Sequence, residues 1–142
     1  MARAALLGLL SLWAAGGSDD ELRKHYTIDK GPDATLTAGS KGALTVRLST
    51  KDEGYIHPDA PLRIKLAAEG AVAVERSALT RADAVDPKPG EKARELAFRI
   101  PIAGVAGASG PGAVSAELSF YLCAQSWCRP VKESLRWTVT VK

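Results

Sequence analysis

The sequence contains little of the chemistry that most enzymes and metal sites require. It has only two cysteines, two histidines and one methionine in 142 residues. The motifs G-x-G-x-x-G, H-E-x-x-H and G-x-S-x-G are absent, and so is a P-loop. Several carboxylates fall in segments predicted to be loops, where such groups are normally solvated: Asp52, Glu53, Asp59, Asp83 and Asp86. The sequence therefore does not predict a nucleotide site, a zinc protease or a serine hydrolase.

The charge balance is also mild. The formal net charge is +3, and no basic stripe with interleaved aromatic residues is present, so no nucleic-acid partner is predicted. Two thiolates together with His57 or His25 could in principle bind a soft cation. However, C-x4-C is not the usual C-x2-C zinc spacing, and no second Cys/His pair exists. We therefore predict neither a metal nor a cofactor.

The first 16 residues are typical of an export signal. Arg3 precedes an apolar run at 4–13, and the small residues 14–16 resemble a cleavage site. The run is too short to span a bilayer, which needs about 20 residues, so no stable membrane span is expected after cleavage; an N-terminal core helix is the alternative. Gly17 stands where a lipid anchor would need cysteine. We predict an exported protein of the bacterial periplasm or cell envelope, where disulfides persist.

The next stretch, residues 17–33, is polar and is predicted to be a linker or N-terminal extension. Within it, 20–25 could form a helical turn or a tether, and 26–28 could form an edge strand. His25 is predicted to be a solvated linker residue.

From residue 34 to residue 142, short alternating segments are separated by turns rich in Gly, Pro and Asp. The predicted strands are 34–37, 43–50, 61–68, 71–76, 95–102, 113–123 and 133–141. About seven short strands with no sustained helical period predict an all-β, antiparallel, immunoglobulin-like β-sandwich. Trp137 is the candidate core aromatic between its sheets.

Both cysteines lie at the connection between the last two predicted strands. Apolar residues alternate with polar ones up to Leu122, so Cys123 has the parity of Tyr121 and should face away from the main core. Facing residues of a hairpin have Cα atoms about 4.5–5.5 Å apart, which suits a Cys123–Cys128 disulfide. Closing so short a loop stabilises a fold by only about 2 kcal/mol. The pair is therefore either a static bridge or a reversible dithiol–disulfide.

Neighbouring side chains could modulate a reactive pair. Arg129 and Lys132 could favour a thiolate electrostatically. Trp127 could shield the bridge or form an apolar docking point, and Tyr121 lies two residues before Cys123.

Three stretches carry a resemblance to a known family. They are residues 51–64 (KDEGYIHPDAPLRI), 96–102 (LAFRIPI) and 121–131 (YLCAQSWCRPV). In this order they resemble the periplasmic N-terminal domain of the thiol–disulfide interchange protein DsbD, over roughly residues 34–142. The resemblance implies an immunoglobulin-like domain in which Cys123 and Cys128 pass electrons to exported proteins, including thioredoxin-like ones. Two features depart from that family: the loop 77–92 has no aromatic residue to cap the disulfide, and the family's better-known members continue into a transmembrane electron conduit, whereas this sequence stops at Lys142.

Two functions are thus predicted. The first is an exported thiol–disulfide oxidoreductase acting through Cys123 and Cys128. The alternative is a non-enzymatic binding or accessory module of an envelope assembly, with a structural disulfide and a partner-binding sheet edge or loop.

Overall fold

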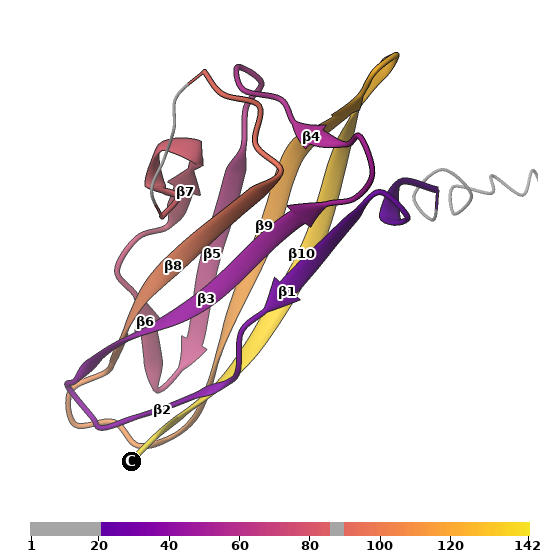
Figure 1. Cartoon of the computed structure of the whole chain (residues 1–142). Helices are drawn as coiled ribbons and strands as arrows, with labels where there is room; N and C mark the ends of the chain where they lie inside the picture. Colours follow the sequence, from indigo (N-terminus) through magenta and orange to yellow (C-terminus); the bar gives the residue numbers. More distant parts are fainter. Residues whose placement is uncertain (1–20, 86–89) are drawn as a thin grey trace, which may run out of the picture.

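The computed structural model describes residues 21–85 and 90–142. The predicted export signal, the predicted cleavage site and the middle of the loop 77–92 lie outside these residues. The described chain is built almost entirely of strands (Figure 1). In chain order they are β1 (Tyr26–Lys30), β2 (Ala34–Leu36), β3 (Lys41–Thr50), β4 (Tyr55–Ile56), β5 (Arg63–Gly70), β6 (Val72–Val74), β7 (Ala78–Thr80), β8 (Glu95–Gly104), β9 (Gly110–Ala124) and β10 (Trp127–Val141). A short 3-10 helix, η1 (Arg81–Asp83), follows β7.

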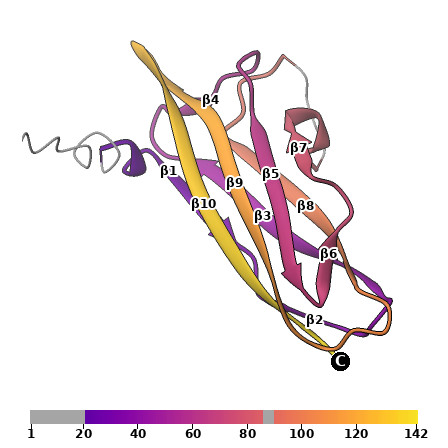
Figure 2. The same cartoon turned by 180° about the vertical axis from the view of Figure 1, so that it is seen from behind.

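These strands form two sheets that face each other. One sheet has the order β1-β3-β8-β6, and the other has the order β2-β10-β9-β5-β7, with β4 paired to β9. Figure 2 shows the second sheet in front, with β9 between β10 and β5. Every pairing is antiparallel except that of β2 with β10, which is parallel. The predicted antiparallel β-sandwich is confirmed.

The core lies between the two sheets and follows the predicted alternation. Side chains that face inward are fully or almost fully buried: Leu44, Val46 and Leu48 from β3, Leu96, Phe98, Ile100 and Ile102 from β8, and Val114, Ala116, Leu118, Phe120 and Leu122 from β9. Trp137 of β10 is completely buried, as predicted, and its Nε1 donates to the Gly31 carbonyl at 3.1 Å. Period-two burial on both sheets is what gives this chain its sandwich.

The sandwich begins earlier than predicted. β1 lies in the stretch assigned to a linker, yet it pairs with β3 from Tyr26↔Thr50 to Lys30↔Val46. The Tyr26 ring is buried, packs edge-on to Phe120 at 5.6 Å between centroids, and its hydroxyl donates to Glu133 Oε1 at 2.5 Å. Residues 21–23 form one helical turn, whose Leu22 is also buried. The boundary at residue 34 therefore moves back into the predicted linker.

Other differences concern short or irregular strands. The described chain has ten strands rather than about seven, because β1 lies in the predicted linker and β4 and β7 lie within segments predicted to be loops. β10 begins at Trp127, six residues before the predicted start at residue 133. The connection between β9 and β10 is consequently a turn of Gln125 and Ser126, not a four-residue loop.

Candidate functional site

The two cysteines lie at the end of the longest hairpin of the molecule. β9 and β10 pair without interruption from Val141↔Gly110 to Trp127↔Ala124, and this register places Cys128 directly opposite Cys123. The sulfurs are bonded at 2.01 Å, with the Cα atoms 4.0 Å apart. The predicted pairing is confirmed.

The two halves of this disulfide differ in exposure. Cys128 is exposed, whereas Cys123 has an exposed fraction of 0%. Cys123 has the outer-face parity that the sequence predicts and does not belong to the central core cluster. The prediction that Cys123 faces away from the main core is confirmed, but the residue is not open to solvent, because β4 pairs with β9 on one side and places Tyr55 opposite Cys123, while Cys128 lies on the other side. Only one sulfur-bearing residue is thus open to a partner.

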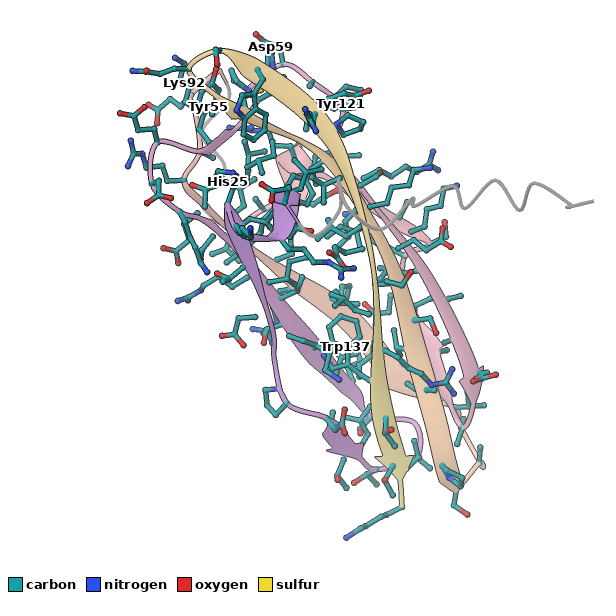
Figure 3. All side chains as sticks on the ribbon, turned by 90° about the vertical axis from the view of Figure 1, so that its right-hand side faces the viewer. His25, Tyr55, Asp59, Lys92, Tyr121 and Trp137 are labelled. Carbon is teal, nitrogen blue, oxygen red and sulfur yellow. A yellow bond between two sulfur atoms is a disulfide. The ribbon has the colours of Figure 1, made fainter. Side chains whose placement is uncertain are left out.

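Tyr55 is a site neighbour that sequence reasoning did not single out. Directly paired residues project from the same face of a sheet, so Tyr55, Cys123 and Cys128 form one row across β4, β9 and β10. The Tyr55 ring is half-buried, and Lys92 Nζ lies 4.7 Å from its centroid. Figure 3 shows both side chains at the hairpin end of the sandwich. An aromatic residue therefore lies opposite the buried cysteine, with a cation over its ring, although the described part of the loop 77–92 contributes no aromatic residue.

Trp127 and Arg129 lie on the opposite face from the disulfide. They pair with Ala124 and Leu122, which places them on the inward-facing side of β10. Of the two roles suggested for Trp127, shielding the bridge does not fit this position, and an apolar docking point stays a prediction. Its ring instead meets His25 edge-on at 5.3 Å between centroids, and the Arg129 guanidinium lies 6.0 Å from the same ring.

His25 is consequently not a solvated linker residue. It is only half-exposed, and together with Trp127, Arg129 and the helical turn it lines a hollow of about 180 Å³. Figure 3 shows His25 beside this turn at the start of β1. This hollow lies at the hairpin end of the sandwich, on the inward-facing side of β10. Cys128, which lies on the outer face, does not line it.

Tyr121 and Lys132 lie on the outer face together with the disulfide. Tyr121 pairs with Pro130 in the row next to the cysteines and retains an exposed fraction of 39%. One row further along, Ser119 lies between Lys132 of β10 and Arg63 of β5. Within residues 21–85 and 90–142, neither cation forms an ion pair. The outer face therefore carries three successive rows: the disulfide, then Tyr121 with Pro130, then Ser119 between the two unpaired cations.

The residues weighed for a metal site are engaged elsewhere. The cysteines are bonded to each other, and His57 Nδ1 accepts hydrogen bonds from the backbone N–H groups of Asp59 and Ala60, both at 3.0 Å. Among the residues that the structure describes, no three His, Cys, Asp or Glu side chains cluster closely enough to hold a metal ion. The same part of the chain has no helix long and apolar enough to cross a membrane.

Comparisons with known proteins bear on the fold. No protein-family model and no curated protein matches the chain. Two structures of Escherichia coli alpha-2-macroglobulin match 82% of it at 17% identity, with TM-scores of 0.52 for the native conformation and 0.51 for the part from domain MG7 to the C-terminus. The matches span only 6% and 16% of those chains. A type I cohesin from Pseudobacteroides cellulosolvens matches 83% of this chain and 92% of its own, at 12% identity and a TM-score of 0.46. The chain therefore has an all-β, immunoglobulin-like fold.

Proposed function

We propose that this domain exchanges electrons with thiol proteins through the Cys123–Cys128 disulfide. The observation that supports the proposal most is the asymmetry of the pair: Cys128 is exposed at the end of a hairpin, and Cys123 is completely buried behind it. Exchange requires one accessible sulfur and a leaving sulfur in line with the attack. A bridge of this kind offers a single sulfur to attack.

The chemistry follows from that asymmetry. A partner thiolate attacks Sγ of Cys128, a new disulfide forms between the partner and Cys128, and the bond to Cys123 breaks with its electron pair on Sγ of Cys123, which then takes a proton. A second partner thiolate attacks the partner's own sulfur and releases Cys128 as a thiolate. The partner dithiol is oxidised to a disulfide, and this domain gains two electrons.

Burial also assigns roles to the reduced pair. A buried sulfur disfavours the charged form, so Cys123 should remain a thiol while the exposed Cys128 is the thiolate that attacks in the reverse direction. Lys132 is the cation of β10 that shares the outer face with Cys128, four residues away, whereas Arg129 lies on the inward side against Trp127. Positive charge on the outer face favours a thiolate there. Cys128 is then the nucleophile in one direction and the attacked sulfur in the other.

We also propose that the domain is exported and that its partner is a thioredoxin-like protein. The apolar run with Arg3 before it and small residues after it favours export to the periplasm or envelope of a bacterium. The resemblance of 121–131 to the DsbD domain favours a thioredoxin-like partner.

The test is the reduction potential of the pair, measured by equilibrating the protein with glutathione or dithiothreitol buffers and quantifying free thiols. Structural disulfides usually lie below about −300 mV, and exchanging ones are more oxidising. We expect a value above that limit. A value well below it, with no mixed disulfide formed by a thioredoxin that lacks its resolving cysteine, would contradict exchange.

A structural disulfide in a binding or accessory module is the second candidate. The complete burial of Cys123 favours it, because buried apolar surroundings make a cysteine inert. The same potential decides between the two, since a static bridge would remain oxidised in buffers that reduce an exchanging one.

A further inference from the structure

β10 has an open edge beside the exposed cysteine. One side of β10 pairs with β9 along its whole length, but its other side pairs only with β2, at Val139–Val141. Figure 2 shows β2 at the far end of β10 from the hairpin. In the described chain, no strand lies against the part of this edge that runs from Cys128 to Ser134.

Hydrogen bonds near the C-terminal end of β10 show which of its residues direct their N–H and C=O groups toward the open edge. Lys30 Nζ donates to the Arg136 carbonyl, and the Thr138 N–H donates to Asp33 Oδ1 at 2.9 Å, so even-numbered residues of β10 point away from β9. The register is unbroken, and alternate residues of a strand point the same way. The Cα separation of 4.0 Å between Cys123 and Cys128 agrees with this assignment. In an antiparallel hairpin, facing residues that exchange no backbone hydrogen bonds are the closer pairs, about 4.5 Å apart.

Cys128, Lys132 and Ser134 therefore direct both their N–H and C=O groups outward, and Pro130 directs a carbonyl alone. All four residues are exposed. No residue that the structure describes accepts a hydrogen bond from the outward N–H groups of this stretch. Such a row pairs readily with an added strand.

The edge also lies in the direction from which the disulfide can be attacked. The bond from Cys128 to Cys123 points from β10 toward β9, so a thiolate that attacks Cys128 in line must approach from the opposite side, across the open edge. A residue of an added antiparallel strand that bonds to both outward groups of Cys128 has its Cα about 5.5 Å away. Disulfides form at about 4.4–6.8 Å, so a cysteine at that position can react without backbone movement.

The positive charge of Lys132 indicates that the added segment also carries an acidic residue. Lys132 lies four residues along the same edge, roughly 13 Å from Cys128, on the outer face and without an ion pair to any described residue. Arg63 extends this positive row through Ser119. An acidic side chain opposite Lys132 would pair with Lys132, and Arg63, roughly 14 Å away across three strand spacings, would add a weaker, longer-range attraction.

We propose that the thiol partner docks as an extended, antiparallel strand on this edge of β10. Its cysteine lies opposite Cys128, and an Asp or Glu four residues before that cysteine lies opposite Lys132. The inference rests on the proposed exchange function and specifies the segment that the site accepts.

Synthetic peptides provide the test. The matched peptide is acetyl-Thr-Glu-Thr-Val-Thr-Cys-Thr-amide, and its controls replace Glu by Lys or carry an N-methyl group. N-methylation of the Glu removes a hydrogen bond to the edge, whereas N-methylation of the following Thr alters an N–H that points away from β10. The rate of mixed-disulfide formation with the full-length protein is followed by mass spectrometry after acid quenching.

We expect the Glu peptide to react about threefold to tenfold faster than the Lys peptide at low salt, because complementary charge acts mainly on association rates. This ratio should collapse in a Lys132→Gln/Arg63→Gln variant and at high salt. N-methylation of Glu should slow the reaction, and N-methylation of the following Thr should not.

Equal rates for all peptides, with normal reduction by dithiothreitol, would overturn the docking inference and leave exchange intact. Failure of glutathione, dithiothreitol and every peptide to react would refute the exchange function, and this inference with it.

Discussion

Replacing Cys123 and Cys128 together by alanine should leave a folded domain that still unfolds cooperatively. The core is supplied by Trp137, Phe98, Phe120 and the aliphatic side chains between the sheets, and Cys123 does not belong to that cluster. The hairpin is also held by continuous β9–β10 pairing. Loss of the bridge should therefore lower stability without removing the fold.

The size of the loss follows from the structure. The bridge joins residues five apart in sequence, for which the chain-entropy model gives about 2 kcal/mol. Truncation of the buried Cys123 adds about 1 kcal/mol of lost packing, and truncation of the exposed Cys128 adds little. The sum, about 3 kcal/mol, is smaller than the 5–15 kcal/mol typical of a domain. It corresponds to a decrease of roughly 10 °C in Tm for a domain of this size.

Urea and thermal unfolding, followed by far-UV circular dichroism and tryptophan fluorescence, measure this loss. Dithiothreitol-reduced wild type is the control, because it lacks the bridge but retains both sulfur atoms. Its free energy of unfolding should lie between those of the oxidised wild type and the double variant. Loss of a cooperative transition in the double variant would refute the reasoning and would identify the bridge as an essential part of the fold.

Three further predictions concern the scaffold. Trp137→Leu should lower the free energy of unfolding by about 3 kcal/mol, because this ring is completely buried; an unchanged urea midpoint would contradict its core role. Burial and the hydrogen bond to Glu133 raise the pKa of Tyr26, so the unfolded chain ionises first and stability should fall as the pH rises above about 10. Tyr26→Phe should show a smaller alkaline loss in urea titrations, and an equal loss would exclude this cause. Gly70→Ala should cost more than about 1 kcal/mol, because φ is +75° and a Cβ would lie 2.5 Å from a backbone oxygen. Gly107→Ala is the matched control, with φ +73° and nothing within 4 Å; equal Tm shifts for the two would refute the steric argument.

Most of the sandwich could be predicted from the sequence, because its long strands are buried on one face. Every second residue is buried along β8, from Leu44 to Leu48 of β3 and from Val114 to Leu122 of β9, and that period can be recognised without a structure. The same alternation in β9 fixed the outer-face parity of Cys123, and the spacing of the cysteines made their pairing geometrically reasonable. Trp137 was identifiable because it follows the period of its strand.

The remaining features depend on contacts that leave no local pattern. The burial of Cys123 results from pairing with Tyr55, which lies far away in sequence on a strand of two residues. The first half of β10 escaped prediction because Arg129 occupies an inward position and Pro130 lacks an N–H group. That half lies at the end of the sandwich and on an open edge, where inward positions need not be apolar and proline is tolerated.

The most direct test of the account is to identify the sulfur that a thiol attacks. The oxidised protein is treated briefly with excess glutathione, quenched with iodoacetamide, digested, and mapped by mass spectrometry. We expect glutathione on Cys128 and the carbamidomethyl group on Cys123, since of the two cysteines only Cys128 is exposed. Glutathione on Cys123, or an intact disulfide after prolonged treatment, would contradict this expectation.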